Sequence, residues 1–438
     1  MNRDPAGALY GPQTALAVRN FPISRMRLQR SFIRALGLIK SCAAKINGER
    51  GYLESGKAAR IARAADDIAE GKYDDHFVVD VFQTGSGTST NMNINEVIGR
   101  LAGAHPNDDV NRGMSSNDAI PSAIHIAAAE CVRENLLPAM EELHDALAAK
   151  AHEFSDVIKT GRTHLQDAAP MRLGQEFSGY ARQVELAVSR IEAAMTGIYE
   201  LPFGGTAVGT GLNAPEGFAA AVIAEIQRRT GQPFHEAGNH FEAQSAKDAV
   251  VFLSAALRNY AIALTKIAND IRWLGSGPRC GLGELRIPEA QPGSSIMPGK
   301  VNPVIAESVL MVCAQVIGYD ATIAWCGAAG NFELNTMMPV MAYDLLESIE
   351  LLTAAGKNFA TRLIAGLEAD RERTSALVEQ SLAMGTALAP EIGYDRAAEL
   401  VEEAHRSGRT VREVAAEKSG LPAGQLERLL DPARQAGQ

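Results

Sequence analysis

The chain has 438 residues, of which 46% are hydrophobic and 21% charged, and its formal net charge is −10. This composition is typical of a folded globular protein, and the length predicts two or three domains. The acidic balance, without any cluster of Lys and Arg, argues against nucleic acid as a partner. No uninterrupted apolar run approaches the roughly 20 residues needed to cross a bilayer, so we expect no membrane partner.

The N-terminal residues and the cysteines both indicate a cytoplasmic protein. Residues 1–5 do not form a positively charged start followed by an apolar stretch, so no secretory signal is visible. The cysteines are odd in number and widely spaced, without the spacing of metal ligands or of a disulfide framework. We expect reduced, mostly buried thiols at Cys42, Cys131, Cys280, Cys313 and Cys326.

The first polar segment covers residues 84–93 and precedes an expected helix. Its glycines free backbone amides, and Ser86 and Thr88 add hydroxyl groups. Amides and the dipole at a helix N-terminus favour an anion, although a plain Ser/Thr-rich cap is the commoner use of such a string. Residues 77–82, just before it, are the best strand candidate, but they could equally be an extended lead into this loop.

Residues 115–118, Ser-Ser-Asn-Asp, form the second polar segment, ahead of a helix with apolar residues at Ile124, Val132, Leu136 and Met140. Ser and Asn are ordinary helix caps, but a cap needs only one of them. Three adjacent polar side chains therefore raise the hypothesis of a ligand.

The third polar segment, residues 161–167, contains His164 between Thr163 and Gln166. A lone histidine is more often structural than catalytic, yet one in this setting could transfer a proton near neutral pH. Like the other polar segments, this one is expected where a helix begins.

Long helices are predicted by apolar residues that recur every three or four positions. The stripes cover residues 173–198, 250–274, 303–316 and 339–352. Such lengths suggest a long helical bundle, and its alanine-rich faces would expose apolar surface unless other subunits covered them, so we expect a homo-oligomer. Beyond about residue 366 the helices shorten, which indicates a small C-terminal domain.

The fourth polar segment, residues 293–303, is dense in Gly and Pro and is predicted to be a loop of fixed backbone shape. Its two serines, Lys300 and Asn302 suit an enzyme that binds a carboxylate and moves a proton, although a tight turn with ordinary polar residues is the alternative. A helix from Asn302 would place Glu307, two turns on, toward Lys300. The four segments together indicate a carboxylate-binding site, with no metal or phosphate-loop pattern.

With these strings in view, the sequence resembles the class II fumarase/aspartase superfamily, and within it the fumarases. The match to Gly-Ser-Ser-x-Met-Pro-x-Lys-x-Asn-Pro at 293–303 is complete, and the other three strings recur in the expected order, so the resemblance runs from about residue 10 to about 430. It implies an all-α, three-domain fold with boundaries at 1–114, 115–366 and 367–438. The central long helices would form a twenty-helix core in a homotetramer, with each active site drawing on three subunits and no cofactor or metal.

The resemblance also implies a role for each site residue. Ser294 looks like the base that takes a proton from carbon, while Lys300 and Asn302 hold the carboxylate whose charge grows as an aci-carboxylate forms. His164 would contact substrate or the departing water, with Glu307 as its charge partner. Helix and loop amides would stabilise the serine alkoxide, and loop closure would exclude water. The rest of the substrate would be bound by Ser86, Thr88, Ser115, Ser116, Asn117 and Thr163.

The implied substrates are fumarate and L-malate, with aspartate ammonia-lyase as the alternative and a catalytically silent homologue as a further one. The strings at 204–207 and 330–335 resemble fumarases, whereas 87–91 and 303–304 are close to aspartase usage. The stretch 105–109 resembles the family's secondary carboxylate site, through His105, Asn107 and Asp108. An arginine usually found upstream has no clear counterpart, so an ordinary polar turn is an equal alternative.

Overall fold

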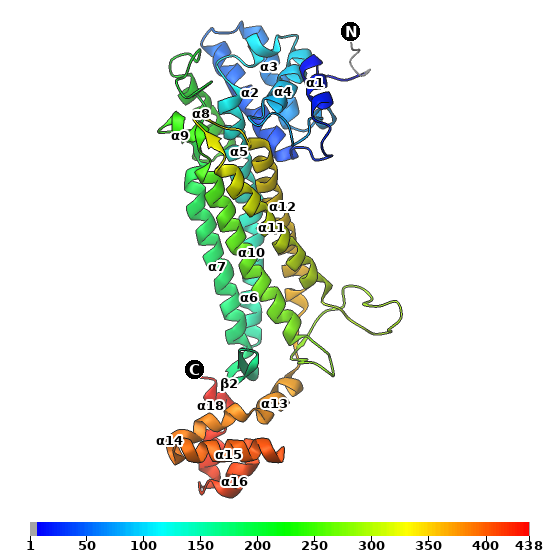
Figure 1. Cartoon of the computed structure of the whole chain (residues 1–438), viewed down its shortest axis with the longest axis vertical. Helices are drawn as coiled ribbons and strands as arrows, with labels where there is room; N and C mark the ends of the chain where they lie inside the picture. The colour runs from blue at the N-terminus through cyan, green and yellow to red at the C-terminus, as the bar shows by residue number, and fades with distance from the viewer. Residues whose placement is uncertain (1–6, 438) are drawn as a thin grey trace. The chain divides into compact units, whose positions relative to one another are not determined.

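The computed structural model describes residues 7–437, which fold mainly into α-helices (Figure 1). The described strands are short and pair two by two, so the mostly helical fold predicted from the sequence is confirmed. The chain divides into two compact units. The first comprises the described part of Met1–Pro138 with Ala187–Ile262 and Val312–Ala354, and the second comprises Ala139–Leu186, Ala263–Met311 and the described part of Ala355–Gln438.

The first unit is built around helix α2 (Arg30–Glu49), which packs against α3 (Ser55–Ala69), α5 (Ser116–Cys131) and α8 (Phe218–Thr230). Most of α2 is buried, including Phe32, Leu36 and Ile39, which explains why its sequence is apolar on more than one face. The remaining elements are α1 (Pro12–Asn20), α4 (Thr88–Ala102), α9 (His240–Ser245), the short helices η1 (Asp74–His76) and η2 (Pro106–Val110), and the strand pairs β3 (Glu200–Leu201) with β4 (His235–Glu236) and β6 (Gly330–Asn331) with β7 (Leu334–Asn335).

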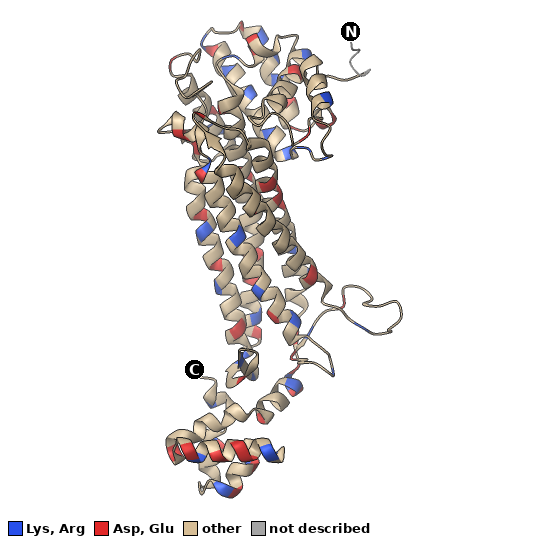
Figure 2. Cartoon of the chain, viewed as in Figure 1, with Lys and Arg blue, Asp and Glu red and all other residues tan. Residues whose placement is uncertain are grey.

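The chain also contains five longer helices, and all of them except α6 follow the predicted apolar stripes. They are α6 (Leu137–Glu153), α7 (Leu173–Ile198), α10 (Asp248–Leu274), α11 (Val304–Gly327) and α12 (Met338–Arg362), and a π-helical turn, η3 (Val132–Leu136), joins α5 to α6. All except α6 contribute many residues to both units. Figure 2 shows little blue or red along α11, whose only charged residues are Glu307 and Asp320.

Helices α10 and α11 are long and apolar enough to cross a membrane by length and composition alone. Half of the most apolar window of α10, and a third of that of α11, is buried within the chain. Buried core helices pass the same test, so the finding is weak evidence for a membrane span, and the expectation of no membrane partner stays a prediction.

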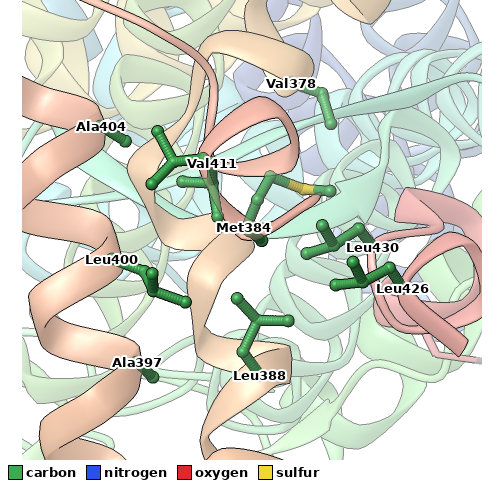
Figure 3. Packing of buried hydrophobic residues seen from close by; sticks show 11 residues of the cluster. Val378, Met384, Leu388, Ala397, Leu400, Ala404, Val411, Leu426 and Leu430 are labelled. Atoms are coloured by element: carbon green, nitrogen blue, oxygen red, sulfur yellow. The ribbon is translucent and has the colours of Figure 1, made fainter. Parts of the chain in front are cut away.

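The second unit contains the hairpin of β1 (Ile158–Thr163) and β2 (Gln166–Arg172), the strand pair β5 (Leu285–Arg286) with β8 (Glu368–Ala369), and the C-terminal helices. These helices enclose an apolar cluster that includes Met384, Leu400 and Leu430 (Figure 3). They are η4 (Ile364–Gly366), α13 (Arg371–Gln380), η5 (Leu382–Leu388), α14 (Ala389–Ile392), α15 (Tyr394–Ser407), α16 (Val411–Lys418), α17 (Ala423–Leu429) and α18 (Pro432–Gln435).

Residues 77–82 and residues 161–167 test two local predictions from the sequence. Residues 77–82 form no strand: residues 77–80 have no regular structure and residues 81 and 82 lie in a bend. The Asp80 carboxylate accepts hydrogen bonds from the Ser24 and Phe82 N–H groups and fixes this segment. The prediction that the third polar segment lies at a helix start is wrong. Residues 161–167 form the turn end of the β1–β2 hairpin, and α7 begins only at Leu173.

Candidate active site

Three hydroxyl groups connect the first two polar segments within the first unit. Gly87, with a left-handed φ of 73°, directly precedes Thr88 at the start of α4. The Thr88 Oγ1 lies 2.8 Å from Ser86 Oγ and 2.7 Å from Ser116 Oγ. The starts of α4 and α5, where backbone N–H groups have no helical acceptors, therefore meet at a row of hydroxyl groups.

A capping box orders the start of α5. The Ser115 hydroxyl accepts from the Asn117 N–H at 3.2 Å, and the Asp118 carboxylate accepts from the Ser115 N–H at 2.9 Å. Asp118 is fully buried, and burial raises the pKa of its carboxyl against the opposing effect of its backbone N–H donors. The second polar segment thus forms a cap, as the structural interpretation predicts, and also leaves Ser116 beside Thr88.

Hydrogen bonds hold the loop 204–207 against the start of α5. Its Gly204 and Thr206 N–H groups donate to Asp118 Oδ2 at 3.1 and 3.0 Å, and Asn117 Nδ2 donates to its Ala207 carbonyl at 2.8 Å. A Cβ at Gly205 would lie 2.0 Å from the buried Gln244 Oε1. Steric space therefore requires glycine at position 205, because any larger residue would displace Gln244.

The third polar segment projects from the second unit on a two-residue turn. His164 and Leu165 are left-handed, with φ of 56° and 61°, and they connect Thr163 at the end of β1 to β2. Both Thr163 and His164 are exposed. The turn has the backbone conformation of a tight hairpin turn, so it presents these side chains to solvent.

A buried ionic cluster anchors the hairpin beneath this turn. Arg162 forms a bidentate pair with the fully buried Glu284, with N–O distances of 2.9 and 3.0 Å. Lys159 Nζ, also buried, lies 3.1 Å from Glu176 Oε2 and 3.7 Å from Glu284 Oε2. Paired charges therefore help to fix the position of the turn.

The fourth polar segment closes on itself. The Gly293 N–H donates to the Lys300 carbonyl at 2.9 Å, and Asn302 Nδ2 donates to the Gly293 carbonyl at 2.8 Å. The Ser294 Oγ accepts from the Ile296 and Met297 N–H groups, both at 3.2 Å. Two backbone donors thus already point at the serine oxygen, and α11 begins just after the loop at Val304.

A cavity of about 700 Å³ in the second unit gathers Lys300, Asn302 and Glu307. Three arginines that the sequence analysis did not single out also line it, namely Arg272, Arg286 and Arg373. Two acidic side chains, Glu307 and Asp370, also line it, and Asp370 accepts from Arg286 at 2.9 Å. The basic side chains outnumber the acidic ones, so positive charge predominates in the cavity. No sequence pattern marks these arginines, because they come from three separate elements.

The single chain does not join all the predicted site residues. Ser86, Thr88, Ser115, Ser116 and Asn117 belong to the first unit, and Thr163, His164, Ser294, Lys300, Asn302 and Glu307 belong to the second. Within residues 7–437, no hydrogen bond or ion pair connects His164 to Glu307 or to Ser294. The same described range contains no group of three or more His, Cys, Asp and Glu side chains able to hold a metal ion, and none of its five cysteines forms a disulfide.

Known proteins resemble this chain over nearly its whole length. A family model described as lyase matches residues 2–318, and one described as fumarase C C-terminus matches residues 385–434. The chain is 53% identical over 439 residues to the class II fumarate hydratase of Mycobacterium tuberculosis, covering 98% of this chain and 93% of that one. The chain belongs to the class II fumarase family.

Other class II fumarases extend the similarity. The mitochondrial fumarate hydratase of Rattus norvegicus is 50% identical over 442 residues, with 98% of this chain and 87% of that one covered. A crystal structure of class II fumarase from Schistosoma mansoni matches with a TM-score of 0.95 at 38% identity, covering 99% and 97% of the two chains. A fumarate lyase:delta crystallin structure from Brucella melitensis, bound to cobalt, matches with a TM-score of 0.96 at 44% identity, covering 100% and 98%. The fold and the lyase class predicted from the sequence are therefore confirmed.

The secondary carboxylate site of the fumarase resemblance falls on one exposed turn. His105 Nδ1 accepts from the Asp108 N–H at 3.0 Å and lies 3.2 Å from an Asp108 carboxylate oxygen. Asn107 lies in the same turn, within η2. Both sequence interpretations predict such a turn, so the secondary site stays a prediction.

Proposed function

We propose that this member of the family catalyses the reversible hydration of fumarate to L-malate without a cofactor. The observation that carries the proposal is the closed loop 293–303, which leads into a predominantly cationic cavity lined by Lys300, Asn302 and Glu307. A dicarboxylate is the substrate class that such a cavity would attract. The similarity to fumarate hydratases over nearly the whole chain supports the same reaction.

Ser294 is the proposed base in the elimination direction. It takes a proton from the carbon next to a carboxylate, and the electron pair moves into that carboxylate to give an aci-carboxylate, whose extra charge Lys300 and Asn302 stabilise. The carbon–oxygen bond at the neighbouring carbon then breaks, and the departing hydroxide takes up a proton, from His164 or from solvent, and leaves as water on the opposite face. The Ile296 and Met297 N–H groups, which already donate to Ser294 Oγ, would stabilise its alkoxide.

His164 is the proposed contact to the departing water, with Glu307 as its charge partner. Among the described residues these two form no hydrogen bond or ion pair with each other, so the proposal relies on groups from more than one chain. The remaining substrate contacts are assigned to Thr163 and to the hydroxyl and amide groups at the starts of α4 and α5, namely Ser86, Thr88, Ser115, Ser116 and Asn117.

A homotetramer is the assembly that we propose, with each site drawing on three subunits. Its support is the apolar surface that the single chain leaves exposed on α10 and α11, including Phe252, Met311 and Trp325. The domain boundaries at 1–114, 115–366 and 367–438, with α6 to α12 as the central part, belong to the same proposal.

A cytoplasmic location is also proposed. Its support is that none of the five cysteines forms a disulfide, which fits a reducing compartment. One of the relatives is named as mitochondrial, so fractionation of the source cells is the direct test.

The test of the reaction is an assay of the purified protein with L-malate and, separately, with L-aspartate, following fumarate by its ultraviolet absorbance. We expect fumarate from malate only. Fumarate from aspartate but not from malate would replace the proposal with aspartate ammonia-lyase. No turnover of either substrate by an intact oligomer would indicate a catalytically silent homologue.

The mechanism is tested by Ser294→Ala. We expect loss of malate turnover by at least about a thousandfold, since the proton acceptor is removed, with the oligomer unchanged by size-exclusion chromatography. The matched control is Ser295→Ala, which changes the neighbouring exposed serine of the same loop and should keep most of the activity. A fully active Ser294→Ala enzyme contradicts the assignment of the base.

A further inference from the structure

Lys40 is a buried ammonium group without a counter-ion. It lies on α2 and is 0% exposed, and it forms no ion pair with any carboxylate among residues 7–437. Its Nζ donates to Asn111 Oδ1 at 2.8 Å and lies 3.9 Å from Met114 Sδ. Burial lowers its pKa to about 7, and the nearby Asp118 charge opposes this only in part.

The stability of the fold does not account for such a lysine. Transfer of an ammonium group from water to the protein interior is unfavourable, and an apolar side chain of similar volume usually serves a buried position equally well or better. A buried lysine without a carboxylate partner is therefore expected where its hydrogen bond has a specific task.

The task is indicated by the convergence of donors on one oxygen atom. Asn111 Oδ1 accepts from Lys40 Nζ and also from Asn91 Nδ2 and Asn95 Nδ2, both at 3.2 Å. Asn91 and Asn95 lie on successive turns of α4, and both are buried. Asn111 itself closes the turn that ends at Met114, because its Nδ2 donates to the Met114 carbonyl at 3.1 Å. One side chain thus joins α2, α4 and the turn before α5.

The two elements held by Asn111 carry the row of hydroxyl groups in the candidate active site. Thr88 lies one helical turn before Asn91, and Ser116 lies two residues after Met114. The contact of 2.7 Å between their hydroxyl oxygens requires α4 and α5 to keep a fixed relative position. Lys40 makes the shortest of the three hydrogen bonds that fix Asn111.

We propose that Lys40 is a positioning residue for substrate binding, which acts through Asn111 to hold Thr88 and Ser116 at the spacing that a substrate carboxylate requires. The inference rests on the proposed function, and the wild-type assay with malate tests that function first. The effect of Lys40 is then measured relative to an active wild type, so the two can fail separately.

The test compares Lys40→Met with the control Lys150→Met. Lys150 is also buried, but it donates to the Leu367 carbonyl at 2.7 Å and pairs with Glu153 at 2.8 Å, in the other unit. We expect Lys40→Met to melt at or above the wild-type temperature, and to raise KM for malate at least tenfold with a smaller change in kcat. Lys150→Met should melt at a lower temperature and keep the wild-type KM.

A Lys40→Met enzyme with wild-type KM overturns the proposal. A raised KM together with a melting temperature below that of Lys150→Met also overturns it, because Lys40 would then be a residue of the fold alone. If Lys40→Met does not fold, the comparison is between Asn111→Asp, which keeps an acceptor for all three donors, and Asn111→Leu, which removes it. A higher KM for Asn111→Leu than for Asn111→Asp supports the proposal, and equal values overturn it.

Discussion

At the scale of single residues, His125 shows how burial separates a structural histidine from a catalytic one. It lies buried on α5, and its Nδ1–H donates to the Glu200 carbonyl at 2.8 Å. Burial, followed by the charge of Lys247, lowers its pKa to about 4. The ring is therefore neutral at physiological pH, and the proposed reaction assigns it no role.

The lowered pKa of His125 predicts a pH-dependent stability. In the unfolded chain this histidine takes up its proton near pH 6.5, but in the folded chain only near pH 4, so stability present above pH 6.5 is lost as the pH falls to about 4. The loss is about 3 kcal/mol of unfolding free energy. His125→Gln should lose that much less than wild type between pH 7 and pH 4, measured by urea unfolding.

The control for this prediction is His405→Gln, which changes an exposed histidine on α15. Its unfolding free energy should follow the wild-type pH dependence. Parallel curves for wild type and His125→Gln would contradict the account of His125.

Single residues of the candidate site were predictable to different degrees. Ser294, Lys300 and Asn302 were singled out because they stand in one short Gly- and Pro-rich string that resembles the fumarases, and their roles stay predictions. Lys40 and Arg272 were not, since each is an isolated basic residue within a helix. Their environments depend on which other helices pack against them, and no local pattern carries that information.

At the scale of elements, the loop 204–207 depends on a glycine. Gly205→Ala would place a Cβ 2.0 Å from Gln244 Oε1 and 3.0 Å from His240 Cβ. Gln244 is buried and its Nε2 donates to the Thr206 carbonyl at 2.8 Å, so it must move and lose this bond. We expect a loss of about 1–3 kcal/mol of unfolding free energy and a raised KM for malate, because the loop holds Asn117.

The matched control is Gly424→Ala on α17, where a Cβ meets no atom within 4 Å. Alanine is the better helix former, so this change should be neutral or stabilise by up to about 1 kcal/mol. Thermal unfolding and malate kinetics of the two variants give the comparison. Equal behaviour of the two would show that the space at Gly205 is not limiting.

The elements themselves were predictable where apolar periodicity determines burial. The stripes of α7, α10, α11 and α12 were predicted because those helices bury one apolar side each. The β1–β2 hairpin was missed because its buried residues include Lys159 and Thr160, which ion pairs and backbone pairing hold in place. A strand buried through charges lacks the alternation of apolar and polar residues that marks a strand.

At the scale of the whole molecule, the exposed apolar residues of α11 predict the assembly. Trp325 is 74% exposed in the single chain, and Met311 is 69% exposed. Trp325→Arg should place a charge in the proposed subunit interface and dissociate the tetramer. Light scattering should give a mass four times that of the 46.6-kDa chain for wild type and a smaller mass for the variant, with loss of activity.

The control is Tyr394→Arg. Tyr394 is also strongly exposed, but it lies on α15 among the C-terminal helices. Its replacement should leave the mass and the activity at wild-type values. A tetrameric Trp325→Arg protein would remove α11 from the proposed interface.

The division of the chain into two units was not predictable from the sequence. The sequence predicts boundaries between successive segments, whereas each unit combines segments that are far apart in the chain and share long helices. The apolar stripes run without interruption through those helices, so no sequence feature indicates the residue at which one unit ends and the other begins. The change of composition after residue 366 was visible because short helices there enclose their own apolar cluster.

The distribution of the proposed catalytic groups over two units has a genetic consequence. Ser116 and Ser294 belong to different units, and in a tetramer whose sites take groups from several chains, one chain can supply an intact Ser116 and another an intact Ser294. Two mutant alleles, each inactive because it lacks one of these serines, would restore a fraction of working sites when both are expressed in one cell. Complementation between two such alleles in one cell is therefore what the proposed sharing of sites between subunits predicts.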